Sequence, residues 1–222
     1  MTNSNLLNSS FSGIRWAGGG LSFAGSQISL ATAAELLVGL KAEGVQWSGA
    51  TVIASPADRQ ALAGANLTGV DLTGLTLRGE RADLTGAKLD NATLTNAVLE
   101  LAQLSGASLT GINAAGASFN GADLSATSTL TGANLSGKQT NLTGAHFVNT
   151  DLSGAKFVGA TVSHADFSGA RDFQTDFSGV SAAGTVFSGA HIYGDGQAFD
   201  SATDLSNADF SNAVLAADVS QS

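Results

Sequence analysis

The sequence of 222 residues contains no cysteine, one proline and one methionine, and only 12% of its residues are charged. Without cysteine, the chain has no disulfide framework, no thiolate metal site and no cysteine nucleophile. Globular domains usually have about 25% charged residues, so we expect a surface made mostly of Ser, Thr, Asn, Gly and Gln. No run approaches the ~18 apolar residues of a transmembrane helix, and the first residues lack the segments of a signal peptide. The sequence therefore favours a cytoplasmic protein without a membrane span.

Basic residues are absent from the C-terminal part of the chain, because no Lys or Arg follows Arg171. Seven aspartates do follow it: Asp172, Asp176, Asp195, Asp200, Asp204, Asp209 and Asp218. They contribute −7 to a net charge of −9. Such a charge disfavours direct binding of nucleic acid through its phosphates. Two interpretations remain open: an acidic end that meets a basic partner, and a solvated surface without one.

A large apolar residue returns at every fifth position over residues 142–192. The series is Leu142, Phe147, Leu152, Phe157, Val162, Phe167, Phe177, Phe187 and Ile192. The residue two positions before each of them is small, as Ala145 is before Phe147. A period of five is neither the 3.6 of a helix nor the 2 of a strand. It indicates a single elongated repeat domain, in which each unit buries its apolar face against its neighbours.

The units from Leu62 to Leu215 include ANLTG, VDLTG, ADLTG and ASLTG, about thirty in all. They resemble the pentapeptide-repeat family, whose unit is A-(D/N)-L-x-x. The resemblance implies an all-β fold, a right-handed quadrilateral parallel β-helix with four units per coil. One large and one small inward side chain per unit suit close packing, and the recurrent Gly suits corner turns with positive φ. We assign residues 56–218 to this β-helix and 219–222 to a tail.

Residues 1–55 are predicted to form an irregular first coil and a short amphipathic helix over about 31–43. Leu36, Leu37 and Leu40 fall on one helical face, and Gly44 gives a C-terminal stop. We interpret this helix as a cap over the open end of the stack, where unpaired backbone would otherwise promote association. The alternative is a helix that only interrupts a loop.

Twenty residues complete a coil, so Phe147, Phe167 and Phe187 are expected to stack on one inner face. Phe157 and Phe177 are expected on the opposite face. Inward register makes these five rings a structural ladder of the core, held by burial and offset stacking, and not a ligand platform.

The five-residue spacing lengthens to seven at three steps, over 77–84, 135–142 and 192–199. These steps are eleven units apart, one short of three coils, so the insertions should fall at successive adjacent corners as small loops or bulges. Asp172 occupies a central position, where a lone buried carboxylate is costly. We therefore expect a local slip that places Phe173 inside and Asp172 at the surface.

The sequence shows no clear pattern of catalytic or metal-ligating residues. His146, His164 and His191 lack metal-ligand spacing, and the aspartates around Gly194 and Gly196 lack the spacing of a calcium loop. The sequence predicts no catalytic, cofactor-binding or metal-ligating residue and no enzyme. Candidate partner-contact residues are those of the acidic end and the first insertion: Asp176, Asp195, Asp200, Asp204, Asp209, Arg78, Glu80 and Arg81.

Two functions are compatible with these features. The first is a non-enzymatic structural or protein-interaction module, whose partner is another protein or a second copy. The resemblance implies the second, because some similar proteins imitate duplex DNA, bind DNA gyrase and confer resistance to gyrase-targeting agents. Interrupted carboxylate rows count against mimicry: Asp151 is followed one coil later by Arg171, and Asp166 by Val186.

Overall fold

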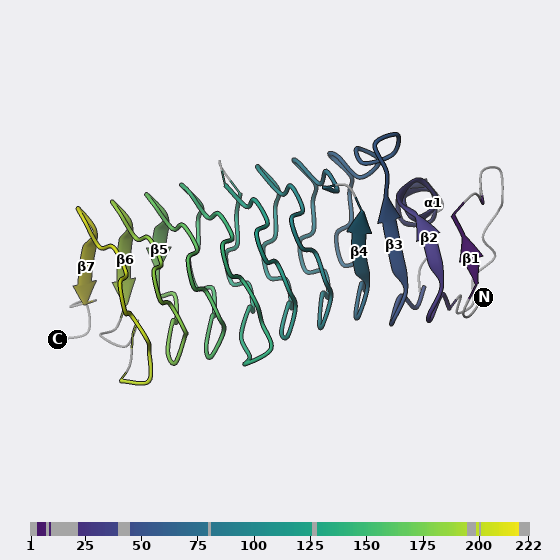
Figure 1. The fold of residues 1–222 in the computed structure, drawn as a ribbon. Helices are drawn as coiled ribbons and strands as arrows, with labels where there is room; N and C mark the ends of the chain where they lie inside the picture. The colour runs from purple at the N-terminus through teal and green to yellow at the C-terminus, as the bar shows by residue number, and fades with distance from the viewer. Residues whose placement is uncertain are drawn as a thin grey trace.

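The chain winds into one rod of stacked coils, with its two termini at opposite ends (Figure 1). This arrangement is seen in a computed structural model. The structure describes residues 4–7, 9, 22–39, 45–79, 81–125, 128–194, 199 and 201–217. Within these residues, no helix has the length and apolar character needed to cross a bilayer.

Each coil has four sides, which we name A to D after the outward residues Asp83, Lys88, Thr93 and Val98 of one coil. Each of the four pairs in parallel with the residue twenty positions later, which is Gln103, Ser108, Asn113 and Ser118, respectively. The same pairing continues along the rod, widened where residues are inserted. The fold is therefore the right-handed four-sided parallel β-helix that the sequence predicted, and this prediction is confirmed.

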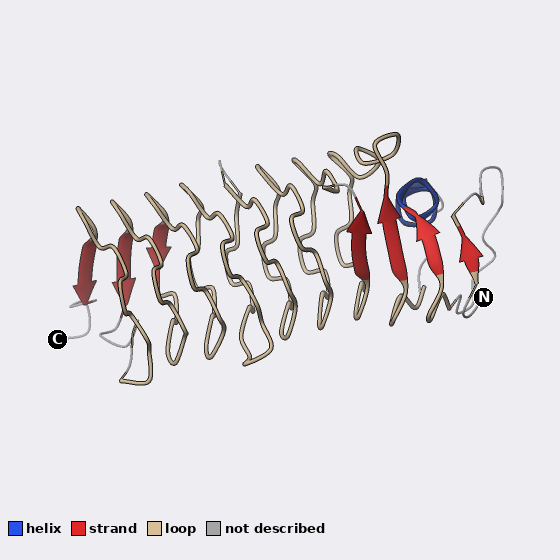
Figure 2. Ribbon diagram, in the orientation of Figure 1, coloured by secondary structure: helices blue, strands red, loops and turns tan. Residues whose placement is uncertain are grey.

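Regular strands occur towards the two ends of the rod, whereas loops with isolated bridges form the middle (Figure 2). A four-stranded parallel sheet on side D joins β1 (Asn5–Leu6), β2 (Gln27–Ser29), β3 (Thr51–Ala54) and β4 (Thr76–Gly79). A three-stranded parallel sheet on side B joins β5 (Arg171–Phe173), β6 (His191–Gly194) and β7 (Val214–Ala217). In the first sheet, β3 lies before residue 55 and pairs directly with β4, which lies after it. The residues before and after position 55 therefore belong to one stack of coils.

The turns at the corners explain why Gly and Asn recur in the unit. The N–H of Ala87 donates to the carbonyl of Leu84 at 2.9 Å, and Gly86 between them has φ of 66°. A positive φ at the third residue of such a turn is the type II geometry that favours glycine. Asn91 and Asn149 occupy equivalent corners with φ of 58°, as asparagine tolerates this conformation better than most residues.

The interior is filled by the central residues and the residues two positions before them, which are buried at the described positions from Ala82 to Ile192. The five predicted phenylalanines lie in two stacks on the opposite sides A and C. Ring centroids are 4.6 Å apart between Phe147 and Phe167 and 4.9 Å apart between Phe157 and Phe177. The two stacks touch edge to face, at 5.8 Å between Phe157 and Phe167. The rings therefore form a closed core without a ligand platform.

The short helix consists of α1 (Leu30–Ala34) and a following π-helical turn, η1 (Glu35–Gly39). The predicted range was 31–43; helical residues begin one position earlier, and residues 40–44 lie outside the described part. Ser29 caps the helix, its hydroxyl accepting the N–H of Thr32 at 3.1 Å. Between β2 on side D and Gln46 on side C, the helix takes the place of sides A and B.

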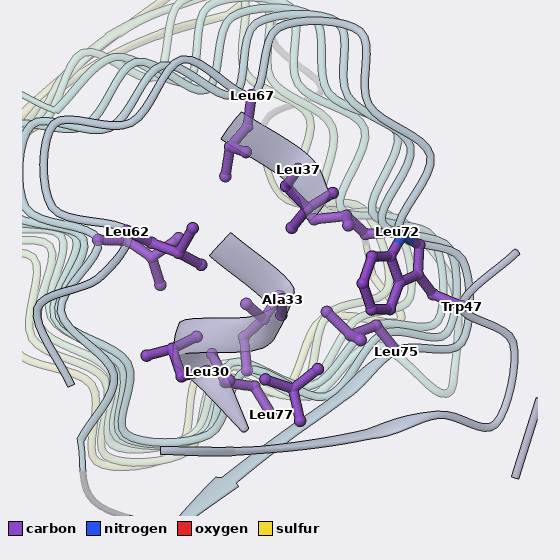
Figure 3. Close-up of a pocket in the computed structure, with 12 residues that line it drawn as sticks. Leu30, Ala33, Leu37, Trp47, Leu62, Leu67, Leu72, Leu75 and Leu77 are labelled. Carbon is purple, nitrogen blue, oxygen red and sulfur yellow. The ribbon is translucent and has the colours of Figure 1, made fainter. Parts of the chain in front are cut away.

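The helix packs across the interior of the first complete coil. Leu30, Ala33 and Leu37 line a small apolar cavity of about 20 Å³ together with Leu62 and Leu67 (Figure 3). Such a volume corresponds to roughly one water molecule. Burial of these side chains closes the N-terminal end of sides A and B.

The sequence predicted two irregularities, the corner positions of the seven-residue steps and a shift in register at Asp172, and the structure agrees with the first only. The seven-residue steps fall at the D/A, C/D and B/C corners in turn, as the central residues on either side of each step show. At Asp172, however, strand pairing continues without a slip: Asp172 pairs with Ile192 and Lys156 with Asp176. The expected shift in register was wrong because the five-residue count is unbroken there, leaving no residue to absorb it. The side chains of Asp172 and Phe173 lie outside the described part, so their orientation stays a prediction.

Candidate interaction surface

The outward aspartates and asparagines have a structural role in the turns. In each case the side-chain oxygen accepts the main-chain N–H two residues later: Asp83 from Thr85 at 2.9 Å, and Asp166 from Ser168 at 2.9 Å. Asn134 makes the same bond to Ser136 at 3.1 Å. This local motif explains why Asp and Asn recur before the central residue of the unit. The carboxylates that make this bond are thereby held in a fixed orientation.

The predicted contact residues Asp176, Asp204 and Asp209 follow the same rule. Their Oδ1 atoms accept N–H groups at 2.9, 2.9 and 2.8 Å. The hydrogen bond from the Ser206 N–H lowers the pKa of Asp204 below its usual value, which favours its charged form. The three lie on sides C, D and A respectively, near the C-terminal end. They lie on three different sides of the rod and do not form one row.

The remaining predicted contact residues fall into two groups. Arg78 and Arg81 are both exposed and flank the D/A corner at the first insertion. Glu80, Asp195 and Asp200 lie outside the described residues. A partner contact by any of the eight residues stays a proposal.

Side A carries aspartates that are two coils apart. Asp83, Asp123, Asp166 and Asp209 alternate along it with Gln103, His146 and Val186. On side B, pairing joins Asp151 to Arg171 and Arg171 to His191. The interruptions predicted from the sequence are therefore present in the parallel rows.

A hollow on side A and the three histidines are the described features that bear on a catalytic or metal site. A surface hollow of about 430 Å³ on side A is lined by Asp123, Ser125, His146, Val148 and Asn149. The three histidines are separated, with His146 on side A, His164 at a D/A corner and His191 on side B. Among the described residues, no group of three or more acidic or histidine side chains is arranged to hold a metal ion.

Asp58 has a structural role that the sequence did not reveal. Its Oδ2 accepts the N–H of Ala31 at 3.1 Å, and its Oδ1 accepts the N–H and hydroxyl of Ser55 at 2.6 and 2.8 Å. Burial acts to raise the pKa of Asp58, but these hydrogen bonds outweigh it and lower the pKa. The carboxylate thus ties the start of α1 to the segment after β3.

Five-residue units, four-sided parallel coils and outward residues held by their own turns define a solenoid of stacked pentapeptides. The family model described as pentapeptide repeats matches in eight copies, over residues 80–113, 99–137 and 138–171. The chain belongs to the pentapeptide-repeat family.

Several solved structures resemble this one. A trypsin-treated form of QnrB1, described as a plasmid-mediated fluoroquinolone resistance protein, is 17% identical, with a TM-score of 0.47 over 97% of this chain and 88% of its own. HetL, described as involved in heterocyst differentiation regulation, from the cyanobacterium Nostoc sp. strain PCC 7120, is 21% identical, with a TM-score of 0.32 over 96% and 84%. A pentapeptide repeat protein of the Arabidopsis thaliana thylakoid lumen is 31% identical, with a TM-score of 0.24 over 57% and 74%. No curated protein sequence matches the chain.

Proposed function

We propose that this chain is a non-enzymatic protein-interaction module that presents the outer surface of a rigid β-helix to a protein partner. The observation that supports this most is the fixed outward side chain: carboxylates and amides on every side are bonded to their own turns. Side chains held in this way lose little freedom when a partner binds, which lowers the entropic cost of association. Stacked repeats also provide the extended surfaces that other solenoids use for binding.

The test is a partner capture followed by mapping with purified components. The partner is retained from a lysate of the source cells on the full chain, purified, and titrated against variants with one changed side each. Lys88→Glu, Thr93→Lys, Val98→Lys and Gln103→Lys alter sides B, C, D and A of adjacent coils at outward positions. Each variant serves as the control for the other three. A partner bound to one side should lose about tenfold in affinity, roughly 1.4 kcal/mol, for the variant of that side, whereas a partner bound to an end should bind all four variants like the parent. Failure to retain any protein at low salt would refute the proposal.

A second candidate is a DNA mimic that binds DNA gyrase, and the four aspartates of side A favour it. Purified gyrase is assayed for supercoiling with a quinolone, with and without this protein, at low and high salt. Asp123→Asn with Asp166→Asn removes charge from side A but keeps an acceptor for each turn. Asp71→Asn with Asp176→Asn does the same on side C as a control. Mimicry requires protection that declines with salt and with the side A pair; absence of protection at either salt level rejects it.

A further inference from the structure

The last coil leaves its inner residues open. Phe199, Leu205 and Phe210 are only half-buried, and Leu215 is 58% exposed. In the coil before it, Ile192 on the same side as Leu215 is 3% exposed. The inner residues on all four sides of the last described coil are therefore at least partly exposed, and apolar residues exposed together are of the kind that marks interaction sites.

Towards the opposite end, the helix covers the interior on sides A and B. Leu36 and Leu37 are buried there, and the helix covers the interior of the first complete coil. Leu6 of β1 is half-buried at this end, like Phe210 at the other. The two ends differ in that the helix covers part of the interior at the N-terminal end, whereas at the C-terminal end Leu215 is 58% exposed.

The main-chain donors of the last described coil have no described coil beyond them. In earlier coils, the N–H of the central residue donates to the next coil, as Phe167 does to Val186 and Phe187 to Asp209, each at 2.7 Å. For Leu205 and Phe210, no further coil follows among the described residues. β7 likewise pairs with β6 on one edge, with no described strand on the other. Open edges of this kind accept an added strand.

The rim of this end is acidic. Asp204 and Asp209 are exposed on sides D and A of the last coil, and the sequence has no Lys or Arg after Arg171. A second copy docked end to end would bring these aspartates against their own counterparts, which is repulsive. A basic rim on the partner would instead be complementary.

We propose that the C-terminal end of the rod is the docking site for an extended segment of a partner protein, in which apolar side chains are flanked by Lys or Arg. The segment adds to the open edge of β7, its apolar side chains cover Phe210 and Leu215, and its basic residues meet Asp204 and Asp209. This inference rests on the proposed interaction function and names its surface and partner class.

The experiment titrates the full chain with labelled synthetic peptides and follows fluorescence anisotropy. One peptide alternates Val and Thr between flanking Lys residues; a second carries Glu in place of the Lys. We expect the basic peptide to bind at least about tenfold more tightly than the acidic one, and to weaken about tenfold in Leu215→Lys or at high salt. Val158→Lys, at a 38% exposed position away from the end, should bind like the parent.

The rim is tested by the pair Asp204→Asn and Asp209→Asn, which keeps acceptors for both turns. It should lose affinity for the basic peptide, whereas Asp123→Asn with Asp166→Asn should not. Circular dichroism checks the fold of each variant; if Leu215→Lys does not fold, Leu215→Thr replaces it.

Three results would overturn the proposal: equal binding of both peptides, binding unaffected by the end variants, or no binding. So would a dimer that Leu215→Lys converts to a monomer, because the occupant would then be a second copy. A purified partner that maps to one side of the rod would leave the proposed function standing and remove only this end as its site.

Discussion

Replacement of a single ring in the phenylalanine stacks should reveal how much stacking contributes to the rod. Phe167 is 1% exposed and lies between two parallel rings, with centroids 4.6 Å from Phe147 and 5.1 Å from Phe187. Its edge contacts with Phe157 and Phe177 are 5.8 and 5.6 Å. Phe167→Leu keeps an apolar side chain but removes two stacked pairs, at about 0.5–1.5 kcal/mol each beyond burial. We expect a loss of about 1–3 kcal/mol in the free energy of unfolding, and about 3–5 kcal/mol for Phe167→Ala.

Phe210 provides the matched control, because it has one stacked neighbour, Phe187 at 4.9 Å, and is half-buried. Phe210→Leu should therefore cost about half as much as Phe167→Leu or less. Urea unfolding followed by circular dichroism measures both losses, with the m-value as a check on cooperativity. Equal losses for the two leucine variants would contradict the reasoning, because Phe210 has fewer stacked neighbours and is also less buried.

Three further predictions concern the cap and the corners. Asp58→Ala should destabilise the first turn of α1 by about 1–2 kcal/mol, measured by amide hydrogen exchange of the helix. Because the folded pKa of Asp58 is lowered, its contribution is present above the unfolded pKa near 3.8 and is lost as pH falls through the folded value; protection of the helix that stays constant across that acid range would contradict this. Gly111→Ala should cost more than Gly64→Ala in thermal unfolding: both have φ of +65°, but the new Cβ lies 2.7 Å from Asn91 Oδ1 in the first and meets nothing in the second. Leu101→Gly should raise the melting temperature, because Leu101 has φ of 59° and is half-exposed, and a left-handed conformation costs a leucine about 1–2 kcal/mol; a lower melting temperature would show that its side chain contributes more than this strain.

The five-residue spacing carried most of the fold because it determines which side chains point inward. Phe147 and Phe167 could be placed on one inner side from their separation of twenty residues, given the four units per coil that the resemblance to the pentapeptide-repeat family implies. Asp58 could not be found in this way, because its bond to Ala31 joins segments 27 residues apart that follow no repeat. Asp172 shows the opposite error: an expected energetic cost was given more weight than the unbroken count, and the pairing followed the count. The turn role of Asp83 was available from the unit itself, since Asp and Asn share one acceptor geometry.

Because Asn can replace Asp in the turn, the turn explains an acceptor at these positions but not a charge. A run of positions occupied by Asp alone therefore indicates that the charge has a further effect. The bond to the N–H two residues later is made by Asn113 and Asn134 as well as by Asp123, so the turn itself requires no charge. Before Arg171 the two residue types are mixed at these positions. After it, the described positions that make this bond are all aspartate, namely Asp176, Asp204 and Asp209. Turn formation therefore does not account for the charge of the C-terminal end. An acidic rim around an open apolar end is what recognition of a basic, partly apolar segment requires.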